Sequence, residues 1–381
     1  DDRNPLLDRV EDLLNQMTIE EKIHLLKGSG ISSALGIGKT AIPGAVGTLV
    51  PTPRLGIPSV YLSDGPAGLR INPTREDEDR TFYCTAFPIG TLISSTWNTE
   101  LVNQIGTAMG KEALEYGIDI ILGPGANIHR HPLCGRNFEY YSEDPLLTGL
   151  IGAAMVNGIE SQGVGTSVKH FVANNQETDR NFNDAIISDR AMREIYLKGF
   201  EIIVKESQPW SIMSSYNKIN GTYVAENKEL LTDILRGEWG FKGLVMTDWF
   251  GGDLPASMVA AGNDLLEPGT KIQWDALTEA SEDGKLTEEK INASVRRILS
   301  VILQSKKMQN YVYTNNPDLE KHAKISRESA SEGMVLLKNN KTLPIPKSLN
   351  VALFGVTSFD FIAGGTGSGD VNEAYTVSLE E

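Results

Sequence analysis

Short runs of apolar residues alternate with amphipathic segments along most of the chain. Each run ends in polar residues, and a segment with apolar residues three or four positions apart usually follows it. The runs that fit buried strands are residues 59–63, 118–122, 166–172, 210–215, 243–247 and 264–266, with weaker runs at 47–50 and 87–92. Because alternating strands and helices form parallel βαβ units, the pattern predicts an α/β fold in which eight strands close a (β/α)8 TIM-like barrel.

The segments outside these runs carry helical signals. Residues 6–26 form two short apolar stripes, and Thr18 with Glu21 fits a capping box between the two. Periodicity and capping residues predict further helices at residues 98–116, 145–162, 189–206, 228–239 and 287–307.

The alternation changes character after Lys307. Residues 310–318 are polar and contain a proline, which is typical of a linker. A helix at 319–339 and a strand at 350–355 would then begin a second α/β unit, which is too small to bury a core of its own. We therefore expect a barrel domain over residues 1–309, a linker over 310–318, and the incomplete N-terminal part of an α/β sandwich domain over 319–381.

Composition narrows the class of protein. The 381 residues include 50 acidic and 35 basic side chains, and the net charge of −15 disfavours a nucleic-acid partner. With 40% apolar and 22% charged residues the chain is globular, and no apolar run approaches the roughly 18 residues of a membrane-spanning helix. Two cysteines, Cys84 and Cys134, are too few for a disulfide scaffold. The compartment stays open, with a secreted or periplasmic location slightly favoured over the cytoplasm.

Polar residues follow several of the predicted strands, and in a barrel they would meet at one mouth. Asp64, Asp248 and Glu267 stand at such ends, and Lys169 with His170 lies within the run 166–172. A strand-end aspartate can equally cap the next helix, and a lone histidine can be a satisfied core residue. A carboxylate beside a buried strand must nevertheless be hydrogen-bonded, paired or functional, because burying an uncompensated charge is costly.

Two other motifs do not favour a metal or a nucleotide. His129 and His131 look like a metal pair, but alternate residues of an extended segment face opposite ways and no third ligand is near in sequence. The glycine-rich stretch 364–369 lacks the lysine of a phosphate loop and the spacing of a dinucleotide site. No metal and no cofactor are expected.

The combination of side chains at the predicted mouth favours carbohydrate chemistry. Aspartates, arginines and lysine can bind ring hydroxyl groups, tyrosine and tryptophan can pack against the C–H face of a sugar, and neither a serine elbow nor a cysteine nucleophile is present. In such a site one carboxylate can attack the anomeric carbon.

Several segments resemble glycoside hydrolase family 3. The most specific is residues 234–249, with the sequence ILRGEWGFKGLVMTDW, which is similar to that family's signature around its catalytic nucleophile. The other matching segments follow one another in the family's order: residues 63–70, 123–125, 135–139, 169–171 and 213–217.

The resemblance implies a role for particular residues. Asp248 would be the nucleophile, Trp249 would shape the sugar platform, and Ser368 would lie in a loop that the second domain extends over the barrel. The remaining substrate-binding residues would be Asp64, Arg70, Arg136, Lys169, His170, Arg180, Met213 and Tyr216. In this family the acid/base glutamate comes from the second domain, so we expect it outside these residues, with Glu177 and Glu267 as fallback candidates. The N-acetylglucosaminidase branch is disfavoured because no second histidine soon follows Lys169 and His170.

The function expected from the resemblance is that of a retaining exo-β-glycosidase that works by double displacement. A β-glucosidase is favoured because Asp64 can accept two sugar hydroxyl groups, and a glucose C6 hydroxyl needs such a partner. The substrates would be β-glucosides or short β-linked oligosaccharides, and a second polypeptide could complete the sandwich domain. The alternatives are a β-xylosidase or arabinosidase and a non-catalytic sugar-binding barrel.

Overall fold

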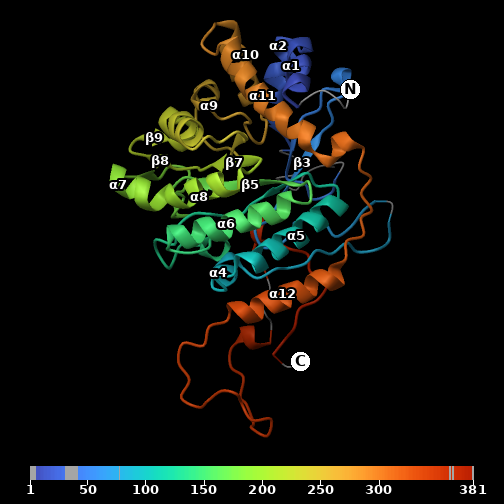
Figure 1. The fold of residues 1–381 in the computed structure, drawn as a ribbon, viewed down its shortest axis with the longest axis vertical. Helices are drawn as coiled ribbons and strands as arrows, with labels where there is room; N and C mark the ends of the chain where they lie inside the picture. Colours follow the sequence, from blue (N-terminus) through green and yellow to red (C-terminus); the bar gives the residue numbers. More distant parts are fainter. Residues whose placement is uncertain (1–5, 31–41, 77, 360–361, 363, 380–381) are drawn as a thin grey trace.

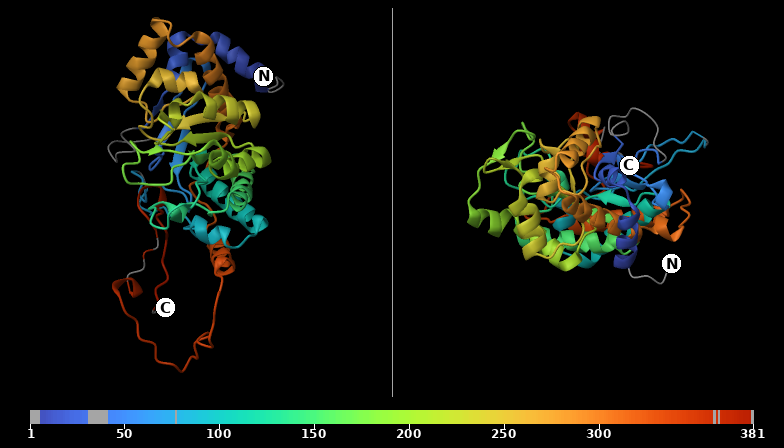
Figure 2. Two further views of the ribbon diagram at one scale, coloured as in Figure 1. Left: turned by 90° about the vertical axis from the view of Figure 1, so that its left-hand side faces the viewer. Right: turned by 90° about the horizontal axis from the view of Figure 1, so that it is seen from above.

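The structure, a computed structural model, describes residues 6–30, 42–76, 78–359, 362 and 364–379. The main body is a curled sheet surrounded by helices (Figures 1 and 2). Beyond the body, the C-terminal part of the chain makes a long excursion below α12 (Leu319–Gly333) and returns toward the barrel.

The central sheet closes on itself. Among the described residues its seven strands have the order β1-β2-β3-β4-β5-β7-β10. Leu265 bridges to Met246 of β10, and Leu266 bridges to Lys27 just before β1, so this segment joins the two edges. The strands are β1 (Gly28–Ser29), β2 (Gly47–Leu49), β3 (Val60–Asp64), β4 (Ile120–Leu122), β5 (Gly165–Phe171), β7 (Ser211–Ser214) and β10 (Leu244–Thr247). The predicted α/β fold with a TIM-like barrel is confirmed.

Two details of the predicted barrel are wrong. Strand β2 runs antiparallel to both β1 and β3, because the short connection to β3 has no room for a crossover helix and forms only a 3-10 turn, Pro53–Leu55. The predicted strand at 87–92 is a loop followed by helix α4 (Gly90–Ser94). Pro88 lacks the N–H that a central strand must donate, which explains why this apolar run does not join the sheet.

Helices cover the outside of the sheet, as Figures 1 and 2 show. The capping box predicted at Thr18 is present, with Glu21 as its partner. The predicted helix at 189–206 is interrupted by a π-helical turn, Met192–Tyr196, and the one at 228–239 is π-helical over Glu229–Glu238. The α-helices of the body are α1 (Leu6–Gln16), α2 (Ile19–Leu25), α5 (Thr99–Glu115), α6 (Pro145–Glu160), α7 (Asp189–Ala191), α8 (Lys198–Ser207), α9 (Pro255–Ala261), α10 (Lys271–Glu282) and α11 (Glu288–Gln304). No helix in the described ranges is both long and apolar enough to cross a membrane.

Helix α12 is fixed to the barrel by a buried contact. His322 lies among α12's buried residues, and its Nδ1 is 2.7 Å from Oε1 of Glu112 on α5. The same carboxylate accepts the backbone N–H of Thr85 at 3.0 Å. Farther along, the N–H of Cys84 donates to the carbonyl of Asn372, which ties the returning segment to the barrel. Cys84 and Cys134 are both free thiols, so they form no disulfide with each other.

The segment beyond α12 does not form the strand that the sequence predicts at 350–355. These residues are in irregular structure, and Val351 and Phe354 are exposed. A strand needs a neighbouring strand to satisfy its backbone groups, and nothing in the described part of the chain supplies one here. The limits proposed for the linker and the second domain stay predictions.

The buried carboxyl group of Glu160 should make the free energy of unfolding depend on pH. Its carboxyl group accepts hydrogen bonds from Thr166 and from the N–H of Trp210, yet burial raises its pKa to about 8. Between pH 4.5 and 8 the unfolded chain ionises this group while the folded chain keeps it protonated, so folding becomes less favourable as pH rises. Glutamine does not ionise, so the free energy of unfolding of Glu160→Gln should not fall with pH for this reason. The difference in free energy of unfolding between Glu160→Gln and wild type should therefore shift in favour of the variant as pH rises, by at most about 1.4 kcal/mol per pH unit.

Urea unfolding of both proteins at pH 5, 6.5 and 8 measures this difference. A constant difference across the three pH values would contradict the prediction.

Candidate active site

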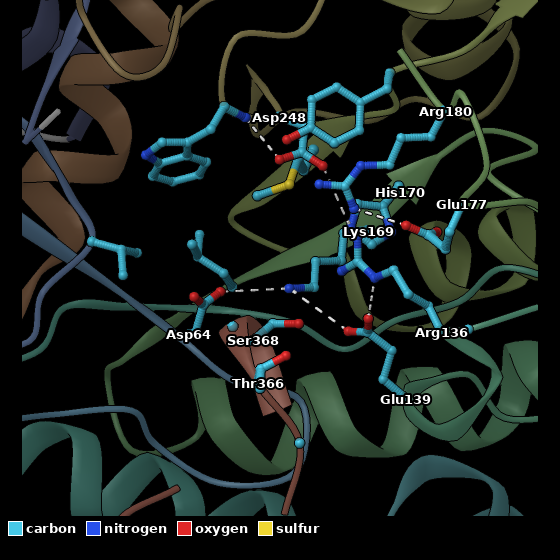
Figure 3. A pocket seen from close by; sticks show the side chains of 18 of the residues that line it. Asp64, Arg136, Glu139, Lys169, His170, Glu177, Arg180, Asp248, Thr366 and Ser368 are labelled. Atoms are coloured by element: carbon cyan, nitrogen blue, oxygen red, sulfur yellow. Dashed lines mark hydrogen bonds and ion pairs between the residues drawn. The ribbon is translucent and has the colours of Figure 1, made fainter. Parts of the chain in front are cut away.

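A cavity of about 740 Å³ opens at the carboxyl ends of the strands (Figure 3). The structure brings every site residue predicted from the sequence to its wall: Asp64, Arg70, Arg136, Lys169, His170, Arg180, Met213, Tyr216, Asp248, Trp249 and Ser368. Asp64, Lys169, Met213 and Asp248 come from the ends of four different strands, whereas Arg136 and Arg180 lie in loops and Ser368 lies in the C-terminal segment.

Asp248 follows β10 in a turn that fixes its carboxylate. Its own N–H donates to the carbonyl of Ser214 on the neighbouring strand, and its carbonyl accepts the N–H of Gly251. The N–H of Trp249 donates to Asp248 Oδ1 at 2.7 Å, and the hydroxyl of Tyr216 donates to the same carboxylate. Two donors therefore orient the group while leaving it directed into the cavity, where Figure 3 shows it opposite Asp64 and Ser368.

The charge of Asp248 is compensated by its surroundings. Burial raises the pKa of this carboxyl group, and the positive charges of Arg136 and Lys169, with the two hydrogen-bond donors, oppose that effect. Burial and the charge of Asp248 also raise the pKa of Tyr216, which keeps the phenol protonated and able to donate.

His170 is a neutral imidazole in this setting. Burial and the positive charges of Arg136, Lys169 and Arg180 hold its pKa well below the ordinary value. Its Nδ1 lies 3.1 Å from the hydroxyl of Tyr140, and its Nε2 lies 3.6 Å from Asp248 Oδ2. The contact with Asp248 is therefore not an ion pair, and Nε2 faces the cavity as a polar group for a ligand.

Lys169 lies between two carboxylates at the base of the cavity. Its Nζ is 3.7 Å from Asp64 Oδ1 and 3.8 Å from Glu139 Oε2, and Arg136 donates to the other oxygen of Glu139 (Figure 3). Lys169 is 2% exposed and Glu139 is 1% exposed, so these charges need one another. The network holds the lysine and arginine heads in fixed positions before any ligand arrives.

The positive and negative side chains of the cavity wall are equal in number. Among the described residues the wall contains four acidic and four basic side chains, with His170 neutral: Asp64, Glu139, Glu177 and Asp248, and Arg70, Arg136, Lys169 and Arg180. A cavity of this kind suits an uncharged ligand rich in hydroxyl groups, since each charged head can bind such groups without a large net field.

Sequence reasoning gave no role to Glu139, Phe138, Phe250 or Thr366, which also line the cavity. Glu139 stood within a segment that matched the family, but its place beneath Lys169 depends on residues far apart in sequence. Phe250 directly follows the Asp248–Trp249 pair, and that adjacency was the available signal.

The two fallback glutamates have different positions. Glu177 lines the cavity, and its Oε2 accepts from Arg180 Nη1 at 2.8 Å. Glu267 is fully buried and does not line the cavity; its carboxyl group lies against Gly28 and Gly47 inside the barrel. Glu267 therefore cannot protonate a ligand bound beside Asp248.

The ring of His129 is engaged with backbone. Its Nε2 lies 2.9 Å from the carbonyl oxygen of Asn137 and 3.0 Å from that of Tyr140. Within the described residues, no group of three or more histidine, cysteine, aspartate or glutamate side chains could hold a metal ion.

The returning C-terminal segment forms one side of the cavity. Residues 365–368 line it, and Asp370 lies 3.7 Å from Arg70. Gly65 makes this close approach possible: a Cβ there would be 2.5 Å from the carbonyl oxygen of Ser368. Ser368 thus reaches the site although it lies 120 positions after Asp248 in the sequence.

Comparison with known proteins gives a consistent result. The sequence model described as the N-terminal domain of glycosyl hydrolase family 3 matches residues 74–301. Thermostable beta-glucosidase B of Acetivibrio thermocellus is 42% identical over 353 residues, which cover 91% of this chain and 44% of that protein. An exo-alpha-(1->6)-L-arabinopyranosidase of Bifidobacterium longum is 40% identical over 337 residues, covering 87% of this chain and 42% of that protein.

A solved structure is also similar. Beta-glucosidase 3B of Thermotoga neapolitana in complex with glucose superposes with a TM-score of 0.95 at 51% identity, covering 98% of this chain and 53% of that one. The chain spans about half the length of the curated relatives it matches.

Gly65 provides a test of the cavity wall. In Gly65→Ala the new methyl group would meet the carbonyl oxygens of Ser368 and Gly68, neither of which can move independently. We expect residues 364–372 to leave the barrel, and their backbone amides to exchange with deuterium faster than in wild type. Gly237→Ala is the control, since its methyl group would make ordinary contact at 3.5 Å. Equal exchange in Gly65→Ala and wild type would show that the segment does not depend on this approach.

Proposed function

The chain belongs to glycoside hydrolase family 3, and we propose that it works as a retaining exo-β-glycosidase that releases terminal β-D-glucose. The observation that carries this proposal is Asp248: a buried carboxylate, oriented by two donors and compensated by Arg136 and Lys169, directed into a cavity lined with hydroxyl-binding groups.

The proposed reaction has two displacements. The Asp248 carboxylate forms a bond to the anomeric carbon while the bond from that carbon to the leaving oxygen breaks, and an acid protonates that oxygen. Water then attacks the same carbon, the acid's conjugate base takes the proton of the water, and the ester bond to Asp248 breaks. Tyr216 and the N–H of Trp249 hold the attacking oxygens in place, so little reorganisation accompanies the attack.

Glucose is the favoured sugar. Asp64, Lys169 and His170 offer an acceptor, a charged donor and a neutral imidazole around one part of the cavity. The relatives named as beta-glucosidases and the solved glucose complex support this choice. A second candidate is an arabinosidase, because a relative named as an arabinopyranosidase is 40% identical to the chain.

The acid/base glutamate is proposed to come from outside these residues. Glu267 is enclosed in the barrel and Glu177 is paired with Arg180, so neither is a ready proton donor. Beyond α12 the chain exposes many large apolar side chains: Met334, Val335, Leu336, Leu337, Leu349, Val351, Phe354, Val356, Phe359 and Ile362. We propose that these pack against further polypeptide, completing an α/β sandwich that brings the glutamate to the cavity.

A mechanism-based label tests the nucleophile. The 2,4-dinitrophenyl 2-deoxy-2-fluoro-β-D-glucoside has a leaving group that needs no protonation, so it should esterify Asp248 even where the acid is missing. Mass spectrometry of peptides should place the added fluoroglucosyl group on Asp248, and Asp248→Asn should stay unlabelled while keeping the fold. A wild-type protein that binds glucose but takes up no label would be a sugar-binding barrel.

The preference for glucose is tested by comparing labelling with a second sugar. The corresponding 2-fluoroxyloside lacks the C6 hydroxyl group, so it should label more slowly and saturate at a higher concentration than the glucoside. A loss of one hydrogen bond corresponds to roughly a tenfold weaker saturation constant. Faster labelling by the xyloside or by an arabinoside would remove glucose as the substrate.

A further inference from the structure

His170 presents Nε2 to the cavity, so the position of its ring proton decides what this nitrogen can do for a ligand. Burial and the neighbouring cations keep the imidazole neutral, and a neutral imidazole carries its proton on either Nδ1 or Nε2. With the proton on Nε2 the ring faces the cavity as a donor, and with the proton on Nδ1 it faces the cavity as an acceptor. The partners of Nδ1, on the other side of the ring, therefore determine which form is present.

Two groups of the described residues lie within hydrogen-bond distance of His170 Nδ1. The hydroxyl of Tyr140 is 3.1 Å away, and Oδ1 of Asn127 is 3.3 Å away. The backbone of His170 fixes the Asn127 amide, whose Nδ2 donates to the His170 carbonyl at 2.9 Å and whose Oδ1 accepts the His170 N–H at 2.8 Å. Asn127 can therefore only accept from Nδ1, whereas the hydroxyl of Tyr140 can either donate or accept.

The neighbours of Tyr140 determine where its hydroxyl donates. Asn174 Nδ2 lies 3.0 Å from the hydroxyl of Tyr140 and 3.3 Å from Oε1 of Glu177. Because the Glu177 carboxylate is paired with Arg180 and accepts hydrogen bonds, the Asn174 atom that faces it must be the amide nitrogen, which then also donates to Tyr140. The phenolic proton must point elsewhere, and His170 Nδ1 is the acceptor within reach among the described residues.

The Tyr140 hydroxyl lies where a missing hydrogen bond would be costly. Tyr140 and Asn174 are both buried, and burial raises the pKa of Tyr140 well above its ordinary value, which keeps the phenol protonated. The phenol ring also packs edge-to-face against the imidazole of His170, with centroids 6.1 Å apart. A proton on His170 Nδ1 would leave the buried phenolic proton without an acceptor, so the geometry disfavours that form.

We propose that Tyr140 is a positioning residue that holds the proton of His170 on Nε2, so that the imidazole meets the sugar as a hydrogen-bond donor. This inference rests on the proposed function. Tyr140 does not itself line the cavity, and it acts through His170. The other tautomer would place a lone pair of Nε2 toward the nucleophile, whose Oδ2 on Asp248 is 3.6 Å away.

Nitrogen NMR reads the tautomer directly. Long-range proton–nitrogen correlation spectra of protein labelled with ¹⁵N-histidine distinguish a protonated ring nitrogen from an unprotonated one. His170→Gln identifies the signals of His170 among the five histidines of the chain. At pH 7 we expect wild type to carry the proton on Nε2 and to leave Nδ1 unprotonated. Asp248→Asn should show the same form, since Nε2 lies beyond hydrogen-bond distance of Asp248.

Tyr140→Phe removes the hydroxyl and keeps the ring. Among the described residues Asn127 Oδ1 is then the acceptor within hydrogen-bond distance of the imidazole, so the form protonated on Nδ1 should become the major one. The loss of the Nε2 donor should weaken D-glucose binding about five- to tenfold in calorimetric titration, the effect of one lost hydrogen bond. The half-saturating concentration of the 2-fluoroglucoside should rise by the same factor.

Tyr141→Phe is the matched control, because it removes the same group from the neighbouring buried tyrosine, which likewise does not line the cavity. It should keep the proton of His170 on Nε2 and bind glucose as wild type does. Melting temperatures show whether each variant is folded. The wild-type spectrum tests the tautomer without any variant of Tyr140, so a poorly folded Tyr140→Phe would not protect the proposal.

Several results would overturn the proposal. In wild type, a proton on Nδ1 or on both nitrogens of His170 would do so, and a shift to Nδ1 in Asp248→Asn would assign the tautomer to the nucleophile instead. A folded Tyr140→Phe with the proton still on Nε2 or with wild-type glucose binding would also overturn it, as would an equal loss of binding in Tyr141→Phe. A wild-type protein that binds glucose but takes up no fluoroglucosyl label would refute the proposed reaction, and the spectra and the titration would still test Tyr140.

Discussion

Asp248 must stay ionised at a position where burial disfavours charge, and much of the structure around the cavity follows from that constraint. Arg136 and Lys169 supply the opposing charge, but they are themselves buried and need partners. Glu139 and Asp64 meet that need. The result is a network of alternating charges in which removing one member would leave another without compensation.

This network also explains why the cavity wall contains many charged side chains whose positive and negative charges nearly cancel. The chain carries a net charge of −15, yet the cavity wall does not share that excess. Burial and three neighbouring cations keep His170 neutral, so it adds a polar surface and no further positive charge. An uncharged sugar can therefore meet strong donors and acceptors without being held by a net field.

Much of the site could be predicted from the sequence because strand ends in a barrel converge whatever the loops between them do. The positions of Asp64, Lys169 and Asp248 followed from that rule alone. The direction of β2 could not be predicted in this way, because the pattern of apolar residues is the same in parallel and antiparallel strands. Only the short connection to β3 determines that β2 is antiparallel. The failed strands at 87–92 and 350–355 show the same limit: an apolar run becomes a strand only if its N–H groups are available and a neighbour exists.

Asp248 and Glu267 show how far two strand-end acids can diverge. Both follow an apolar run and both are enclosed, and sequence pattern alone treated them as similar. Asp248 turns into a cavity where donors and cations stabilise the carboxylate, whereas the carboxyl group of Glu267 lies against Gly28 and Gly47 and has no hydrogen-bond partner among the described residues. Burial raises the pKa of both groups, but neighbouring cations and hydrogen-bond donors oppose the shift at Asp248, whereas no charged side chain in the described ranges opposes it at Glu267. The difference comes from the residues that face each carboxyl group, which only the closed barrel brings together.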